Sequence, residues 1–234
     1  MRRVQITPDT KLVTVAGRPT RTIGILIAIQ LGLFLIYAFA DAPPWVKDQL
    51  IASNAKTLGQ FKIWQLASAL FLHIQSRPII VNLLILWLVG NSLERWWGKN
   101  RFLFFYFVCG LSGLVVGLLF GFGWPKQLLF GTGGSMAGLL FAFGLVFAER
   151  QPFAYNRLVP MKAKIIAPVL GSFFILGNLV GGAYWELELY GGGLLAATFF
   201  VARPRELLGK WRVKRAKKKF NVVEGGKKKD SYLN

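Results

Sequence analysis

The sequence is poor in acidic residues, in cysteine and in histidine. Its 234 residues contain 10 Asp and Glu against 29 Lys and Arg, a net charge of +19, and a single histidine, His73. The single cysteine, Cys109, excludes an intrachain disulfide. The sequence also carries no Walker, Rossmann, zinc or haem signature, so we expect neither a cofactor nor a metal ion.

Apolar side chains, by contrast, are abundant. Hydrophobic residues make up 54% of the chain and charged residues only 17%, which is more apolar surface than a soluble domain of this size can bury. The basic residues stand mostly between the apolar runs and not within them. This pattern is typical of a membrane protein and argues against a soluble nucleic-acid-binding protein.

Six apolar segments predict an all-α membrane protein, a bundle of six transmembrane helices. They cover about residues 22–40, 78–97, 102–122, 133–149, 165–183 and 187–202. The first ends in Ala38-Phe39-Ala40, which resembles a signal-peptidase site, but its apolar run is longer than that of a usual signal peptide and we predict a retained span. Residues 41–77 are mixed and carry several aromatics, so we expect a loop in the headgroup region and no span there.

The distribution of positive charge predicts the orientation. If all six segments span the membrane, 24 of the 29 Lys and Arg residues fall on one side, and the positive-inside rule then places both termini in the cytoplasm. We therefore predict a cytoplasmic segment at 1–21, a membrane domain at 22–202 and a basic cytoplasmic tail at 203–234. The membrane is a bacterial inner membrane or an organellar membrane.

The tail combines a short apolar helical face with a cluster of basic residues. Leu207, Leu208 and Trp211 have the spacing of one face of a surface helix. The basic cluster that follows is Lys214, Arg215, Lys217, Lys218 and Lys219. Each basic side chain near an anionic membrane contributes about 1 kcal/mol of binding, so we predict contact with anionic lipids. Binding to nucleic acid, a ribosome or an acidic protein is the alternative.

Three short motifs lie in and before the second apolar segment. They are Phe71-Leu72-His73, Asn82 nine residues later, and Gly90-Asn91-Ser92-Leu93-Glu94-Arg95-Trp96-Trp97-Gly98. Together they resemble the rhomboid intramembrane protease family, whose six-helix core has a second span that begins near a His, carries an Asn and ends in this Gly-Glu-Gly pattern. The resemblance covers about residues 22–202 and implies structural roles for His73, Gly90, Glu94 and Gly98.

The resemblance also implies where a rhomboid Ser–His dyad would lie. The serine belongs in Gly-x-Ser-Gly at the start of the fourth segment, where this chain has Gly131-Thr132-Gly133-Gly134, with Gly138 fixing the register. The positions that the family fills with serine, histidine and a second, oxyanion-binding histidine are held here by Gly133, Tyr190 and Pro78. We therefore predict an inactive member, a rhomboid pseudoprotease that is not an enzyme.

The chemistry of the remaining residues agrees with that prediction. A serine alcohol needs a general base, usually His or Lys, within hydrogen-bond reach, but His73 falls outside the dyad positions and the fourth and sixth segments contain no Lys. A register shift of one would place Leu189 at the histidine position. The alternative is a rhomboid-type serine protease with Ser135 as a displaced nucleophile. Ser135 lies roughly 200° around the helix from Gly133, and we favour a packing role for it.

By resemblance, inactive rhomboid-family proteins bind transmembrane helices of other membrane proteins. We predict the same here, as a scaffold, an assembly or routing factor, or a subunit of a larger membrane complex. The alternative is a scaffold that anchors lipid or ribosomes through its tail. Close helix contacts in lipid use small residues and a few polar bonds, and the predicted binding residues are Asn82, Gly134, Gly138, Gly192 and Gly193. The glycines of the sixth segment also predict a close contact with the fourth.

Two carboxylates lie at the outer end of the sixth segment. We expect Glu186 and Glu188 to be solvated, with binding of a cation or of a partner's lysine as the alternative. Asn178, in the fifth segment, is expected to cross-bond helices, because an unpaired polar group in lipid is unfavourable.

Overall fold

The computed structural model describes most of the chain between residues 12 and 201. The described residues are 12–15, 17–39, 44–74, 76–120, 128–149, 151–154, 157–158, 162–182 and 184–201. The predicted tail, its basic cluster and its surface helix lie outside these residues.

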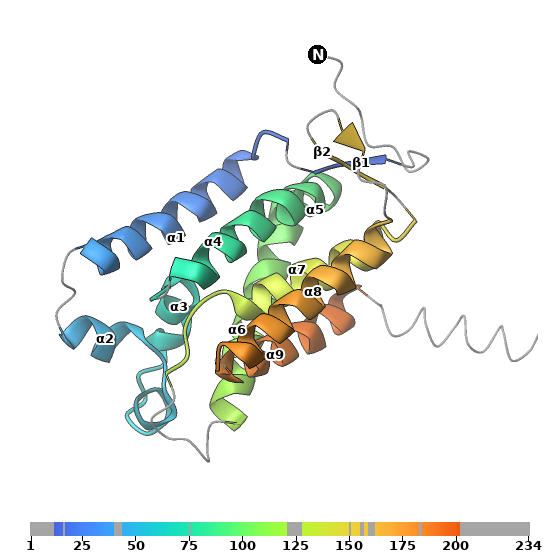
Figure 1. Ribbon diagram of the computed structural model, residues 1–234. Coiled ribbons are helices and arrows are strands. Elements are labelled where there is room, and N and C mark those ends of the chain that lie inside the picture. The colour runs from blue at the N-terminus through green and yellow to red at the C-terminus, as the bar shows by residue number, and fades with distance from the viewer. Residues whose placement is uncertain are drawn as a thin grey trace, which may run out of the picture. The chain divides into compact units, whose positions relative to one another are not determined.

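A bundle of apolar helices confirms the predicted all-α membrane fold (Figure 1). Its main helices are α1 (Arg21–Phe39), the continuous α4 (Ser76–Ile85), η2 (Leu86–Gly90) and α5 (Asn91–Trp97), then α6 (Lys99–Phe120), α7 (Gly133–Val146), α8 (Ala163–Val180) and α9 (Tyr184–Val201). Among the described residues, α1, the helix from Pro78 to Trp97, α6 and α8 are long and apolar enough to cross a membrane. The shorter α7 is also apolar, and the six predicted segments correspond to these helices with small shifts at their ends.

The centre of the bundle is formed by α6, α7 and α9, which pack directly on one another. Glycines allow this contact. A Cβ added to Gly193 would lie 2.0 Å from the carbonyl oxygen of Gly134, and one added to Gly192 would lie 2.4 Å from that of Ser112. Real Cβ atoms do not approach so closely, so only glycine fits these positions. The predicted contact between the fourth and sixth segments is thereby confirmed.

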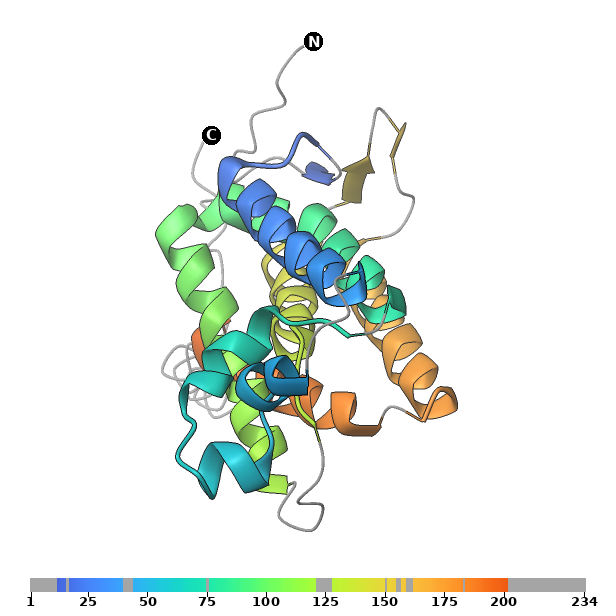
Figure 2. The same cartoon turned by 90° about the vertical axis from the view of Figure 1, so that its left-hand side faces the viewer.

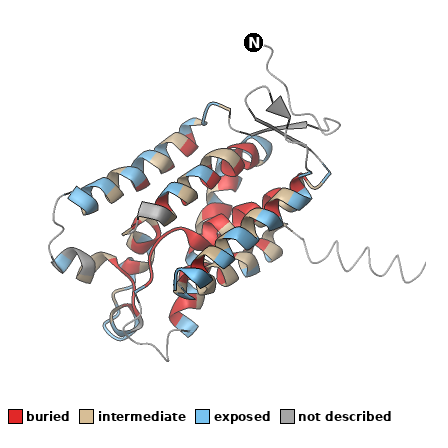
Figure 3. Ribbon diagram, in the orientation of Figure 1, coloured by how far each residue is buried: buried red, intermediate tan, exposed pale blue. Residues whose placement is uncertain are grey.

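The outer helices α1 and α8 are attached more loosely. Figure 3 shows the buried positions gathered in α6 and α7, whereas α1 and α8 are largely exposed or half-buried. The two views in Figures 1 and 2 place α1 beside α4, where it also packs on η2. Of the α8 side chains, Ala163, Ala167 and Asn178 are the buried ones. An apolar helix with so little protein contact has its remaining surface available to lipid or to another helix.

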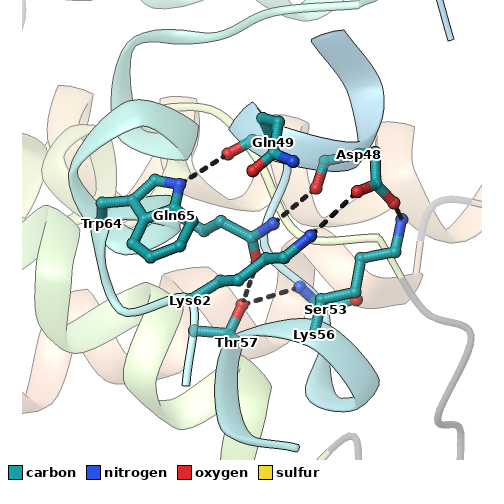
Figure 4. A network of polar contacts seen from close by, with 8 residues as sticks. All are labelled: Asp48, Gln49, Ser53, Lys56, Thr57, Lys62, Trp64 and Gln65. Atoms are coloured by element: carbon teal, nitrogen blue, oxygen red, sulfur yellow. Dashed lines mark hydrogen bonds and ion pairs between the residues drawn. The ribbon is translucent and has the colours of Figure 1, made fainter. Parts of the chain in front are cut away.

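Between α1 and α4, the predicted loop contains three short helices that the sequence did not indicate, and none of its described helices is long enough to cross a membrane. They are α2 (Pro44–Leu50), η1 (Asn54–Leu58) and α3 (Trp64–Phe71). A polar network holds them together (Figure 4): Gln65 donates to the Asp48 carbonyl at 2.8 Å and accepts from the Thr57 hydroxyl at 2.7 Å. Lys56 and Lys62 both pair with the Asp48 carboxylate, and they lower its pKa to about 2. Bonds between side chains far apart in this segment thus hold the three helices together, and no local hydrophobic pattern in the sequence indicates such bonds.

Three short strands were not predicted. They are β1 (Leu12–Val15), β2 (Gln151–Ala154) and β3 (Arg157–Leu158). β1 pairs in parallel with β2, from Leu12 opposite Gln151 to Val15 opposite Ala154, and β2 pairs with β3 in an antiparallel hairpin. The pairing brings the stretch before α1 and the stretch after α7 together. It supports placing these two basic segments on the same side of the membrane, as the charge count predicts.

Candidate functional site

The motif from Gly90 to Gly98 ties the start of α1 to α5. The Glu94 carboxylate accepts a hydrogen bond from the Thr20 hydroxyl, and Arg95 donates to the Arg18 carbonyl at 2.6 Å. Gly98 ends α5 with φ of +83°, a conformation that favours glycine. Glu94 is therefore a structural hydrogen-bond acceptor, as predicted.

His73 links the segment before α4 to the start of α7. Its Nε2 lies 3.2 Å from Asn82 Nδ2 and 3.4 Å from Thr132 Oγ1, and its Nδ1 lies 3.4 Å from the Phe71 carbonyl oxygen. The contacts fit a tautomer with the proton on Nδ1, which leaves Nε2 to accept. Burial lowers the pKa of His73 to about 4, so the ring is neutral at pH 7 and joins Asn82 to Thr132.

The structure brings together the positions that the family resemblance pairs. A Cβ added to Gly133 would lie 2.9 Å from Cε1 of Tyr190, so these residues of α7 and α9 face each other. Pro78 and Asn82 line a small void of about 10 Å³ beside Gly133, which is room for about one water molecule. Gly133, Tyr190 and Pro78 are therefore neighbours in the structure.

Ser135 points to a different helix. It is fully buried, and its hydroxyl donates to the Tyr106 carbonyl of α6 at 2.8 Å. A Cβ added to Gly110 of α6 would lie 2.5 Å from Ser135 Oγ. Gly133 faces α9 while Ser135 faces α6, as the helical rotation between them predicts.

Glu186 corrects one prediction, because it is buried and not solvated. Only 7% of it is exposed. Its Oε2 accepts from Asn178 Nδ2 of α8 at 2.6 Å and from the Tyr190 hydroxyl at 2.8 Å, and Asn178 Nδ2 lies 2.7 Å from the Tyr190 oxygen. Asn178 thus cross-bonds α8 to α9, as expected. Glu186 and Tyr190 lie four residues apart on one helix face, and this spacing is the sequence feature that could have indicated their contact.

An apolar cavity of about 420 Å³ lies between α4, α7, α8 and α9. Asn82 and Tyr190 line it, as does Lys164 at the start of α8, whose amine is paired with Glu149 at 2.6 Å. Along α8 the lining runs from Lys164 to Ile175, which corresponds to about 16 Å of helix at 1.5 Å per residue. Most of the wall is apolar, with side chains such as Ile85, Met136, Leu140, Phe141 and Phe174.

The predicted binding residues separate into two groups. Asn82 lines both the large cavity and the small void. The other four, Gly134, Gly138, Gly192 and Gly193, are buried in contacts among α6, α7 and α9. They join the protein's own helices, and a partner helix cannot reach them without displacing one of these three. Within the described part of the chain, no three His, Cys, Asp or Glu side chains gather where they could hold a metal ion.

Comparison with known proteins identifies the domain. The sequence model of the Rhomboid domain matches residues 60–198. The chain is 27% identical over 205 residues to the rhomboid protease GluP of Bacillus subtilis (strain 168), covering 80% of this chain and 39% of that protein. It is 24% identical over 182 residues to rhomboid-like protease 3 of Toxoplasma gondii, covering 67% of this chain and 69% of that protein. The chain therefore spans less than half of the first relative and about two thirds of the second.

These matches contradict the prediction that the chain is not an enzyme. That prediction rested on the residue types at two positions, Gly133 and Tyr190, whereas the comparisons find a rhomboid domain shared with two proteins named as proteases. Aligning a short motif identifies which residue stands at a position, but it does not measure whether the protein is active. The domain match extends over more than half of the sequence, and together with the helical membrane bundle it shows that this chain belongs to the rhomboid family.

Proposed function

We propose that this rhomboid-family protein binds a transmembrane segment of another membrane protein in the cavity between α4, α7, α8 and α9. The observation that carries the proposal is the cavity itself, about 420 Å³ of mainly apolar space. The walls on either side are helices with exposed apolar side chains, such as Ile80 on α4 and Phe173 on α8, which are 66% and 69% exposed. A segment of about three helical turns fits the length of α8 that lines the cavity.

The chemistry of the cavity suits a helix in lipid. Association of helices within a membrane depends on close packing and on a few polar contacts, because lipid is as apolar as the helix surface. The apolar wall supplies the packing, and Asn82 and Tyr190 supply polar contacts at one end of the cavity. The few buried contacts of α8 allow this helix to adjust to an incoming segment. In this role the protein serves as a scaffold, an assembly or routing factor, or a subunit of a membrane complex.

Glycines of α8 provide a matched test. Gly171 lines the cavity, and a Cβ there meets no atom within 4 Å, so the backbone has room for a side chain at this position and Gly171→Leu reduces the space of the cavity. Gly177 also has room for a Cβ but is not among the lining residues, so Gly177→Leu is the control. We expect an apolar helical peptide, measured by energy transfer to the labelled protein in vesicles, to bind the control and the wild type equally and Gly171→Leu at least tenfold more weakly. Equal binding to all three would exclude this cavity as the site.

Cleavage of the bound segment is a second candidate function, favoured by the names of both relatives. In the chain, the hydroxyls near the start of α7 belong to Thr132 and Ser135, and Ser135 is the nucleophile of the protease alternative. Incubation of the reconstituted protein with a model transmembrane substrate tests it. Cleavage that disappears in Ser135→Ala would support this candidate, whereas an intact substrate or unchanged cleavage in Ser135→Ala would exclude Ser135.

The basic tail is proposed as a second attachment. Lys214, Arg215 and Lys217 to Lys219 suit anionic lipid headgroups, and joining such a contact to a weak intramembrane one adds avidity. Nucleic acid or a ribosome is the alternative ligand. Flotation of the protein truncated after Arg205 with anionic vesicles and with ribosomes separates the two.

A further inference from the structure

Glu186 is a buried carboxylate with no cationic partner among the described residues. The ion pairs of the described chain join Asp48 and Glu149 to lysines, and none involves Glu186. Both of its hydrogen bonds end on Oε2, and no described residue donates to Oε1. A buried carboxylate without a cationic partner is unfavourable unless its hydrogen bonds compensate, so a cation placed beside it would stabilise it.

The carboxylate does not line the large cavity but lies beside it, separated from it by shared neighbours. Glu186 lines the small void together with Asn82, and Asn82 also lines the large cavity. Tyr190, which donates to the carboxylate at 2.8 Å, lines the large cavity as well. A group that enters the Asn82–Tyr190 end of the cavity therefore comes next to the Glu186 cluster, by which we mean Glu186, Asn178 and Tyr190.

The other end of the cavity has the opposite charge. Lys164 lines it, and its amine is already held by Glu149 at 2.6 Å. A compensated cation thus lines the cavity at the start of α8, and a carboxylate without a cationic partner among the described residues lies beside the other end, near the start of α9. This polarity suits a ligand whose positive charge lies near the Glu186 end.

We propose, on the basis of the proposed function, that the cavity prefers transmembrane segments that carry a Lys or Arg near the Glu186 end, where the basic side chain pairs with Glu186. A Lys or Arg stem can follow the apolar wall while its head reaches the carboxylate. Asn178 and Tyr190 hold the carboxylate in position through Oε2 and leave Oε1 for the cation. A basic residue that is unfavourable in lipid gains a partner on binding, so the site selects segments that carry such a residue.

The test uses the full chain in phosphatidylglycerol–phosphatidylcholine vesicles and apolar helical peptides that differ at one position. One peptide has Leu at every core position, one has Lys in the half that lies near Glu186, and one has Lys in the opposite half. We expect wild-type protein to bind the first Lys peptide at least tenfold more tightly than the Leu peptide, and to show no such gain for the other Lys peptide. Equal affinity for all three would overturn the proposal and leave the proposed function standing. Binding of none would exclude both.

Variants at Glu186 locate the charge. Glu186→Gln keeps the size and the acceptor oxygen and should reduce the preference for Lys to less than twofold, while Glu186→Asp should restore part of it. Glu188→Gln, which removes a carboxylate from the same helix end, is the control and should keep the full preference. A preference that persists in Glu186→Gln would overturn the proposal. Because the comparison of the three peptides uses the wild-type protein, it remains decisive even where a variant does not fold.

An amine-bearing lipid is the competing occupant. Addition of phosphatidylethanolamine to the vesicles should change the preference less than twofold. If it abolishes binding of the Lys peptide, and raises the melting temperature of the wild type but not of Glu186→Gln, the cation is a lipid headgroup and the proposal is wrong.

Discussion

The contact between α7 and α9 predicts a large effect for the smallest substitution. A methyl group added at Gly193 would lie 2.0 Å from the carbonyl oxygen of Gly134, 2.5 Å from its carbonyl carbon and 2.6 Å from its Cα. Carbon–oxygen contacts normally begin at about 3.3 Å, so Gly193→Ala must push the two helices apart by more than about 1 Å. A gap of 0.5–1 Å already loses roughly a quarter to a half of the attraction between facing atoms.

We expect Gly193→Ala to destabilise the protein by about 3 kcal/mol, at the upper end of overpacking effects. By the scaling for domains of this size, that is a fall of roughly 6 to 12 °C in the melting temperature, measured in detergent by the fluorescence of the tryptophans. Gly191→Ala is the matched control, because a Cβ at Gly191 meets no atom within 4 Å. It should stabilise α9 by about 1 kcal/mol through helix propensity alone. Equal melting temperatures for the two variants would refute the close contact.

Three further predictions concern pH, orientation and the tail. Burial holds the pKa of His73 at about 4, against 6.5 in the unfolded chain, so the unfolded state binds more protons between these two pH values. The free energy of unfolding should therefore be full above about pH 6.5 and fall by on the order of 3 kcal/mol towards pH 4. Denaturation curves measure this pH dependence, and His73→Asn should remove it. Reporter tags at residues 1 and 234 should both be cytoplasmic and one at residue 55 external; opposite signals at the two ends would mean an odd number of spans. Truncation after Arg205 should weaken flotation with anionic vesicles, and the loss should shrink as salt rises, unless the tail binds something other than lipid.

The sequence predicted the helices well because the length and apolar composition of each segment by themselves indicate a helix in a membrane. It also predicted the close contact between the fourth and sixth segments, since runs of small residues have few other uses in a membrane helix. The burial of Glu186 was not predicted because it depends on Asn178 of another helix, and the sequence does not show which way the Asn178 side chain points. The short helices after α1 were missed for a similar reason, since the bonds of Gln65 to Asp48 and Thr57 cross between them. The cavity is likewise formed by four helices together, α4, α7, α8 and α9, so no single segment of the sequence indicates it.

The pairing of β1 with β2 sets an order of assembly. Residues 12–15 are synthesised well before their partner, residues 151–154, which follows α7. Until then α1 is fastened to the bundle by shorter-range bonds, such as those of Trp87 to the Gly17 carbonyl at 2.9 Å and of Asn91 to the backbone of Thr20 at 3.2 Å. Because a contact between segments so far apart in sequence forms late, the β1–β2 pairing is among the last contacts of this region to form. A nascent chain that stalls before residue 151 therefore holds α1 through its contacts with η2 and α5 but lacks the β1–β2 pairing.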